Sequence, residues 1–198
     1  MTEKQIINDY LLKTNPNITN YYYFKSAIEF NDIQKIIQLV PQEKLYDGNI
    51  SGEIDKSYRS SRIYWIPKNT DTLWLYEKIL EFVKNANDKM WNFDLTNLND
   101  DIQYTEYDAS YEGHYDWHLD VGGTRSSTRK ISVTVQLSDP DDYEGGEFQF
   151  LINRTISEPG KQQGTVVLFP SFLLHRVKQV TKGIRRSLVL WIHGPPFR

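Results

Sequence analysis

Hydrophobic and polar positions follow different patterns in the two halves of the chain. Over the first hundred residues, apolar residues recur at the three- and four-residue spacing that is typical of amphipathic helices. A short helix is predicted over residues 31–40, with Asn31-Asp32 as its cap and a proline directly after it. A longer helix is predicted from Thr70-Asp71 onward. Its apolar positions, which we expect near one face, are Leu73, Trp74, Ile79, Leu80, Val83 and Ala86.

The second half of the chain alternates short β-prone runs with turn residues. Before it, residues 42–62 predict a loop or a weak strand, and a β-prone run over 63–66 stops at Pro67. Further strands are predicted near residues 102–107, 113–119, 130–137, 147–152, 164–169 and 186–192. Many short strands at this spacing are typical of a sandwich or barrel. The predicted fold class is therefore α+β, mainly β, with N-terminal helices bracing one face of a sheet.

The length of 198 residues fits one domain. The pattern changes near residue 100, but a change of element type does not by itself mark a domain boundary. We therefore expect a single domain over 1–198, in which 1–100 form a helix-rich support region and 101–198 form the β-rich core.

Composition narrows the chemistry that the chain can perform. The sequence has 0 Cys, which excludes disulfides, iron–sulfur clusters and thiolate zinc fingers. It has only 4 His, so a metal site must combine imidazole with carboxylate. The net charge of -3 argues against a general nucleic-acid binder. No apolar run is long enough to span a bilayer, and the N-terminus has no apolar signal core, so we expect a cytoplasmic protein without a membrane partner.

Two His-x-Asp pairs lie close together and are the first candidates for chemistry. They are His114 with Asp116 and His118 with Asp120. Residues two apart on a strand face the same side, so either pair can offer one imidazole and one carboxylate to a metal. Two histidines and one carboxylate form the facial triad of non-haem Fe(II) oxygenases. The alternative is an amphipathic strand with a solvated polar face.

The third ligand must come from elsewhere, and His175 and His193 are the remaining histidines. His175 follows an apolar strand, and Arg185 lies ten residues further on, where another apolar strand opens. A buried cation needs an anionic partner. A dicarboxylate ligand would fit, because guanidinium binds carboxylate bidentately. The alternatives are a salt bridge to an internal Asp or Glu and exposure of Arg185 at the sheet edge.

Taken in order, His118-x-Asp120, His175 and Arg185 resemble the 2-oxoglutarate- and Fe(II)-dependent dioxygenases. Within that superfamily, the chain is most similar to the prolyl 4-hydroxylase-like, PKHD-type hydroxylases. The resemblance covers roughly residues 100–195, where several separated motifs occur in the family's order, and the first hundred residues match only loosely. The supporting motifs are Tyr115-Asp116-Trp117-His118-x-Asp120, Ser132–Ser138, Tyr143–Phe148 and Leu168-Phe169-Pro170-Ser171-x-x-x-His175.

The resemblance implies a double-stranded β-helix, or jelly roll, with flanking helices. It selects His118, Asp120 and His175 as the Fe(II) ligands. 2-Oxoglutarate would chelate the metal through its 1-carboxylate and 2-oxo group, with its far carboxylate on Arg185, and O₂ would be the second cosubstrate. His114 and Asp116 would then lie near the ligands or on the surface, and we expect His193 to be structural or exposed.

Further cosubstrate contacts are also implied by the resemblance. Tyr107 would hydrogen-bond 2-oxoglutarate, although a core tyrosine is the alternative. Gln136 stands where relatives often place a tyrosine on the far carboxylate, and its amide could still donate.

The resemblance also implies the residues that meet the substrate. Trp191 would line the pocket, with simple sheet packing as its alternative. The loop 121–129 carries Arg125 and Arg129 and would act as a substrate lid, with an ordinary hairpin loop as the alternative. Tyr115, just before the metal pair, is a further substrate-binding candidate.

These roles predict a hydroxylase that couples oxidative decarboxylation of 2-oxoglutarate to C–H hydroxylation. The expected substrate is a proline-containing peptide or protein, with ascorbate as a reductant. The alternatives are a hydroxylase of a free amino acid or another small molecule, and a non-catalytic jelly-roll binding module. The complete triad and Arg185 argue against the binding module.

Overall fold

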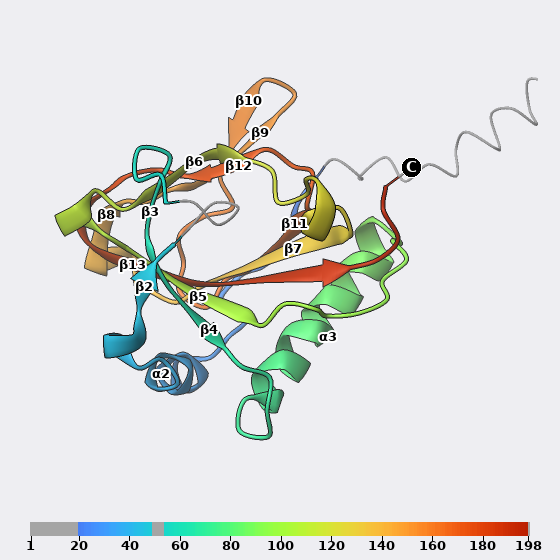
Figure 1. Cartoon of the computed structure of the whole chain (residues 1–198), viewed down its shortest axis with the longest axis horizontal. Coiled ribbons are helices and arrows are strands. Elements are labelled where there is room, and N and C mark those ends of the chain that lie inside the picture. The colour runs from blue at the N-terminus through green and yellow to red at the C-terminus, as the bar shows by residue number, and fades with distance from the viewer. Residues whose placement is uncertain (1–19, 49–53, 198) are drawn as a thin grey trace, which may run out of the picture.

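Two antiparallel sheets face each other in the computed structural model, which describes residues 20–48 and 54–197 (Figure 1). The larger, here the major sheet, has the order β1-β11-β7-β13-β5-β4-β2, and β8 pairs with β13. Its strands are β1 (Tyr22–Phe24), β2 (Tyr46–Asp47), β4 (Arg62–Ile66), β5 (Ile102–Asp108), β7 (Arg129–Gln136), β8 (Tyr143–Gly145), β11 (Val166–Pro170) and β13 (Val180–His193).

The smaller, here the minor sheet, has the order β10-β9-β12-β6-β3. Its strands are β3 (Arg59–Ser60), β6 (His114–His118), β9 (Phe148–Ile152), β10 (Thr155–Ser157) and β12 (His175–Val177). The helices are α2 (Phe30–Gln38) and α3 (Leu73–Met90), with short 3-10 turns η1 (Gln42–Lys44), η2 (Ala109–Tyr111), η3 (Thr124–Ser126) and η4 (Pro140–Asp142). The predicted α+β, mainly β class is confirmed.

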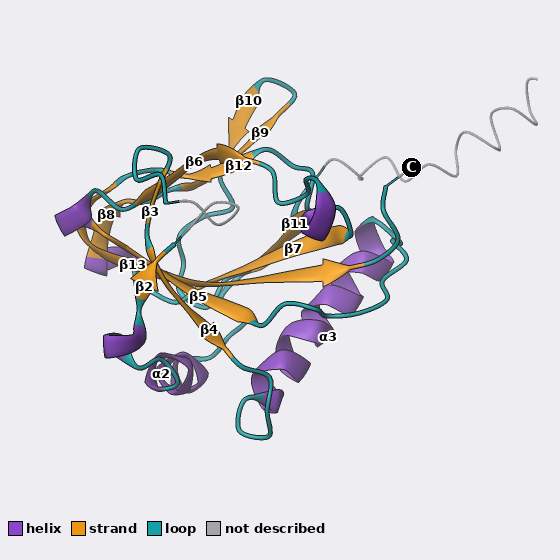
Figure 2. Ribbon diagram, viewed as in Figure 1, coloured by secondary structure: helices purple, strands orange, loops and turns teal. Residues whose placement is uncertain are grey.

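The two faces of the major sheet differ in chemistry because side chains alternate along each strand. One face is apolar and packs against α2 and α3, which lie on the side away from the minor sheet (Figure 2). On β7 this face carries Ile131, Val133 and Val135, each no more than 1% exposed. Burying an aliphatic side chain of this size contributes about 1.5–3 kcal/mol. The helix side therefore supplies most of the core.

The opposite face of the major sheet is polar although it is buried. On β7 it carries Ser132, Thr134 and Gln136, and on β5 Gln103 and Thr105. The strand register places Gln103 beside Val189 on β13, which in turn lies beside Thr134. A buried polar surface is costly unless its groups find partners. This face, here the polar floor, lies under the space between the two sheets.

The predicted helices exist, with differences at their ends and in their phase. The residue that precedes α2 is Glu29, without a side-chain capping bond, so the predicted Asn31-Asp32 cap is wrong. In α3, Leu73 and Leu80 are exposed, whereas Leu75 is fully buried. At 100° per residue, the buried stripe lies about 100° around the helix from these two leucines. The prediction therefore placed them on the wrong part of the helix.

The first hundred residues also complete the two sheets rather than only bracing them. β1 pairs with β11, β4 with β5 and β3 with β6. The segment 42–62, expected to be a loop or a weak strand, contains β2 and β3. The strands predicted from residue 102 onward all exist, and the last is longer than expected. No helix in the described ranges is long and apolar enough to cross a membrane.

Candidate metal centre and ligand cavity

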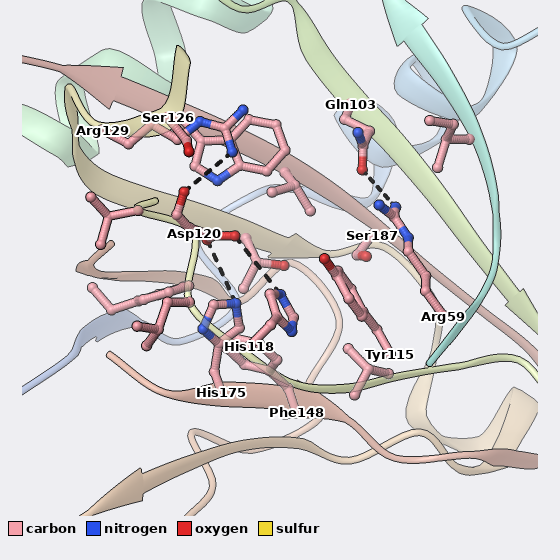
Figure 3. Close-up of a pocket in the computed structure, with 18 of the residues that line it drawn as sticks. Arg59, Gln103, Tyr115, His118, Asp120, Ser126, Arg129, Phe148, His175 and Ser187 are labelled. Atoms are coloured by element: carbon pink, nitrogen blue, oxygen red, sulfur yellow. Dashed lines mark hydrogen bonds and ion pairs between the residues drawn. The ribbon is translucent and has the colours of Figure 1, made fainter. Parts of the chain in front are cut away.

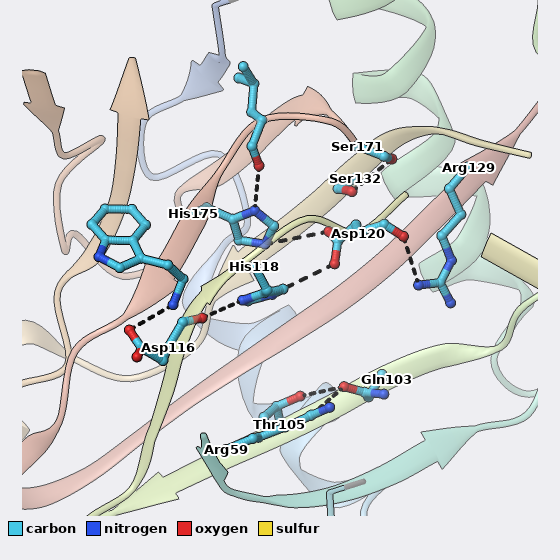
Figure 4. A network of polar contacts seen from close by, with 12 residues as sticks. Arg59, Gln103, Thr105, Asp116, His118, Asp120, Arg129, Ser132, Ser171 and His175 are labelled. Atoms are coloured by element: carbon cyan, nitrogen blue, oxygen red, sulfur yellow. Dashed lines mark hydrogen bonds and ion pairs between the residues drawn. The ribbon is translucent and has the colours of Figure 1, made fainter. Parts of the chain in front are cut away.

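Strand pairing in the minor sheet brings His118, Asp120 and His175 together. His118 ends β6 and His175 begins β12, and the two residues are direct cross-strand partners. Asp120 lies two residues beyond β6, where its backbone N–H donates to the Ser171 carbonyl at 3.0 Å. The three side chains converge as Figure 4 shows.

The donor atoms of this triad are spaced as ligands of one metal ion. His175 Nε2 lies 3.5 Å from Asp120 Oδ2, and His118 Nε2 lies 3.8 Å from Asp120 Oδ1. All three ligand atoms lie within 4.8 Å of one another. These separations would allow the three atoms to hold one metal ion.

Backbone carbonyls orient both imidazoles. His118 Nδ1 donates to the Asp116 carbonyl at 2.7 Å, and His175 Nδ1 donates to the Leu173 carbonyl at 2.8 Å. A carbonyl only accepts, so each Nδ1 carries a proton, and each Nε2 is the ring nitrogen left to face a metal ion. Burial, with a further contribution from His175, lowers the pKa of His118 to about 3, so its ring is neutral as a metal ligand must be.

The carboxylate of Asp120 lacks a protein partner on one oxygen. Its Oδ2 is buried and accepts no hydrogen bond from any residue in the described ranges. Burial raises the pKa of this carboxyl, but the polar and cationic groups around it, among them Ser132 and Arg129, bring it below its usual value. An ionised, buried carboxylate oxygen without a partner needs an explanation, and a cation supplies one. The donor set of two imidazoles and one carboxylate fits Fe(II).

The triad borders a cavity of about 400 Å³ between the sheets (Figure 3). Five other residues singled out in the sequence also line it: Tyr107, Tyr115, Arg129, Arg185 and Trp191. The volume lies within the range of small-molecule and cofactor sites.

Residues 102–193 match the family model of the 2OG-Fe(II) oxygenase superfamily. A PKHD-type hydroxylase of Prochlorococcus marinus (strain NATL2A) is 30% identical over 181 residues, which are 87% of this chain and 78% of that relative. The chain belongs to the 2OG-Fe(II) oxygenase superfamily. The recognition of a prolyl 4-hydroxylase-like, PKHD-type dioxygenase from its sequence motifs is confirmed.

Other similarities to this oxygenase differ in extent. A PKHD-type hydroxylase of Synechococcus sp. (strain CC9902) is 38% identical over 80 residues, and this match spans 36% of that relative and 40% of this chain. A structure of the "prolyl hydroxylase in complex with hypoxia inducible factor oxygen degradation domain peptide fragment from Trichoplax adhaerens" has a TM-score of 0.76 at 17% identity. The alignment covers 98% of this chain and 94% of that one, which confirms the jelly-roll fold.

The pair His114 and Asp116 lies outside the metal centre of the oxygenase. His114 hydrogen-bonds the Glu112 and Ser57 carbonyls at 2.7 and 3.2 Å. Asp116 is exposed and accepts from the Trp117 N–H at 2.8 Å. His118 and Asp120 are therefore the pair that meets His175.

Arg185 is buried, with 3% of its surface exposed, and its guanidinium lies 5.6 Å from the Tyr107 ring centroid. It donates to Ser187 Oγ at 3.3 Å, but within the described ranges no carboxylate lies in ion-pair distance of it. Neither alternative for Arg185, an internal salt bridge or an exposed edge, describes its surroundings. An anionic ligand in the oxygenase cavity would neutralise it.

Gln136 and Arg129, which the sequence assigned to the cosubstrate and the substrate, both have protein partners. Gln136 lines a small recess beside Arg185 rather than the main cavity, and its Nε2 donates to the Tyr143 hydroxyl at 3.0 Å. Arg129 pairs with Asp100 at 3.1 Å, and its guanidinium lies 3.8 Å from the Trp191 ring.

Arg125 and His193 are the last two residues that the sequence singled out. The backbone of Arg125 lies in η3, but its side chain is outside what the structure describes. His193 is buried and contacts Thr128 Oγ1 at 2.8 Å and Asp100 Oδ2 at 3.2 Å, so it is structural rather than exposed.

Sequence reasoning missed one charged residue of the cavity. Arg59 on β3 is 7% exposed and lines the cavity. It donates to Ser61 Oγ at 2.9 Å and to Gln103 Oε1 at 3.0 Å. It lies in the segment expected to be a loop or a weak strand. The polar alternation of Gln103 and Thr105 with apolar neighbours on β5 was the available signal that this sheet face meets a ligand.

Proposed function

We propose that this oxygenase hydroxylates a C–H bond of a prolyl residue in a peptide or protein, while 2-oxoglutarate is oxidatively decarboxylated to succinate and CO₂. The supporting observation is the combination, in one cavity, of the His118, Asp120 and His175 donor atoms with the buried cation of Arg185. A mononuclear metal with open positions and a site for a dicarboxylate together favour this reaction class.

The three ligands would hold Fe(II), which with 2-oxoglutarate and O₂ supplies the oxidising power for C–H hydroxylation. The guanidinium of Arg185 binds the far carboxylate of 2-oxoglutarate in a site from which water is largely excluded. Burial raises the pKa of Tyr107, so its hydroxyl stays protonated and can donate to the same ligand. Gln136 lies in the adjoining recess beside Arg185, where its Nε2 donates to the Tyr143 hydroxyl.

The substrate would approach from the side of the 121–129 loop. Trp191, which stacks with Arg129, offers aromatic surface there, and its Nε1 is buried without a hydrogen-bond partner among the described residues. Tyr115 lines the cavity beside His118. Arg129, although paired with Asp100, borders the cavity, and Arg125 lies on the same loop. The Trichoplax protein named above was solved with a peptide, which favours a peptide or protein as substrate.

A second candidate is hydroxylation of a free amino acid or another small molecule. The cavity volume of about 400 Å³ favours it, because that space is at the lower end of ligand pockets and accommodates a small substrate. Ascorbate as a reductant and a cytoplasmic location stay predictions.

The test has two stages. First, Fe(II) and 2-oxoglutarate are added anaerobically, and the visible charge-transfer band of the chelate is recorded for the wild type and for His175→Ala. The wild type should show the band and the variant should not. A wild type without the band refutes the function. Second, proline-containing peptides and free amino acids are incubated aerobically, and mass spectrometry identifies which class gains one oxygen atom.

A further inference from the structure

Three side chains of the minor sheet form a continuous stack that ends on a metal ligand. The Arg59 guanidinium lies 4.7 Å from the centroid of the Tyr115 ring. The Tyr115 ring lies 3.5 Å from the His118 ring, with only 13° between their planes. Figure 3 shows Tyr115 between the other two side chains. We refer to these residues as the Arg59–Tyr115–His118 stack.

The backbone of the minor sheet builds this stack. Arg59 on β3 is the direct cross-strand partner of Tyr115 on β6, so their side chains are neighbours on one face. Along β6, His118 is opposite His175 and Tyr115 is opposite Val177, so the register shifts between the two pairs. This β-bulge brings Tyr115 and His118, three residues apart, onto the same side. A regular strand would place them on opposite faces.

The two histidine ligands are held in different ways. The His175 ring lies 4.7 Å from the Phe169 ring and 5.7 Å from the Phe148 ring, so an apolar cluster packs around it. The His118 ring has Tyr115 as its stacked partner and His175 as its other aromatic neighbour in the described ranges. The hydrogen bond that it makes within the described part of the chain, from Nδ1 to the Asp116 carbonyl, places a proton on Nδ1 but leaves the ring free to tilt about that bond.

We propose that Arg59 and Tyr115 are positioning residues that hold the His118 imidazole in the plane required for metal binding. This proposal rests on the metal site of the proposed function. Tyr115 fixes the tilt of the ring by face-to-face contact. Arg59 holds Tyr115 through its cation–π contact. Arg59 is itself anchored to Gln103 on the polar floor, so the orientation of His118 is tied to the major sheet.

The test measures Mn(II) binding to the metal-free protein by isothermal titration calorimetry, without 2-oxoglutarate or substrate. Tyr115→Phe keeps the ring and should bind as the wild type does. Tyr115→Leu removes the stack and should weaken binding about 10-fold or more, as loss of groups that orient metal ligands does. Arg59→Met keeps a long side chain without the charge and should weaken binding less than Tyr115→Leu.

Arg176 offers a matched control. Its guanidinium lies 4.5 Å from the Trp117 ring and donates to Gln149, an equivalent cation–π contact that does not touch His118. Arg176→Met should therefore leave Mn(II) affinity unchanged. Equal losses in Arg176→Met and Arg59→Met would show a general effect on the sheet and overturn the proposal.

The double variant Arg59→Met/Tyr115→Leu separates a positioning role from a merely structural one. If Arg59 acts through Tyr115, the double variant binds Mn(II) as Tyr115→Leu does, whereas additive losses overturn the role of Arg59. Tyr115→Leu with wild-type affinity and a cooperative melt overturns the whole proposal. If Tyr115→Leu does not fold, wild-type affinity in Arg59→Met overturns it. A wild type that binds no Mn(II) refutes the metal site itself, which is a different outcome.

Discussion

Replacing Arg185 tests the proposed cosubstrate site most directly. The side chain is 3% exposed and has no carboxylate partner among the described residues, so a ligand carboxylate would be the main charge that compensates it. Truncating one partner of a buried, hydrogen-bonded charge pair costs roughly 2–5 kcal/mol. At about 1.4 kcal/mol per tenfold change, Arg185→Met should raise the KM for 2-oxoglutarate by about 30- to 4,000-fold. Arg185→Lys keeps the charge but loses the bidentate guanidinium, so its KM for 2-oxoglutarate should lie between those of the wild type and Arg185→Met.

The melting temperature of Arg185→Met gives a second test. Loss of an internal salt bridge would lower it, whereas loss of an uncompensated buried charge would not. Without 2-oxoglutarate, Arg185→Met removes an uncompensated buried charge, so its melting temperature should stay close to that of the wild type or rise. At a ligand concentration about 100 times its Kd, the wild type should gain about 2.7 kcal/mol. For a chain of this length that is a rise of about 5–10 °C, which the variant should not show.

Arg186 is the control for these measurements, because it is next to Arg185 on β13 but points to the other face. It pairs with Glu106 at 3.3 Å. Arg186→Met should lower stability by about 1 kcal/mol or less and leave the KM for 2-oxoglutarate unchanged. The reasoning about Arg185 is refuted if Arg185→Met keeps the wild-type KM, or if it destabilises the ligand-free protein by several kcal/mol, as removal of one partner of a fully buried salt bridge would.

Three other changes test separate parts of the molecule. His175→Ala should abolish turnover and the rise in melting temperature that Mn(II) causes in the wild type; a variant that still gains stability from Mn(II) would contradict the assignment. Gly164→Ala should cost more than about 1 kcal/mol in urea unfolding, because φ is +75° and the new Cβ would lie 2.2 Å from the Ile28 carbonyl oxygen. Glu147 is partly buried; burial raises its pKa, but its hydrogen bond with Lys161 contributes to a net pKa below 4.5. Its contribution to stability is therefore present above pH 4.5 and is lost as the pH falls through the folded-state pKa, so Glu147→Gln should be less stable than the wild type at pH 7 but equally stable at the acidic end of a pH series.

The strands that the sequence predicted are those with at least five residues, where alternation is visible. β3 and β12 have two and three residues, too few for any period to appear, and their pairing depends on distant segments. Arg59 was missed for that reason. The choice between the two His-x-Asp pairs required the family resemblance, because regular alternation puts His114 and His118 on the same face, and only the bulge in β6 separates them.

The sequence also could not predict which residues the charged side chains contact. Arg129 was expected to meet a substrate, but the fold brings Asp100 to its guanidinium from a loop 29 residues away. His193 contacts the same carboxylate, which no spacing rule connects to either residue. His175 and Arg185 line the same cavity, as the family resemblance implied. Their spacing along the chain alone left an internal salt bridge and an exposed edge open for Arg185.

The two chemically distinct faces of the major sheet have a consequence for how such a protein can change over evolutionary time. On β7, two sets of alternating positions have separate roles: Val133 and Val135 pack in the apolar core with the helices, and Thr134 between them lines the cavity. Substitutions at one set of positions leave the other set's packing in place. New ligand preferences can therefore accumulate on one face of the sheet without putting the folding of the chain at risk.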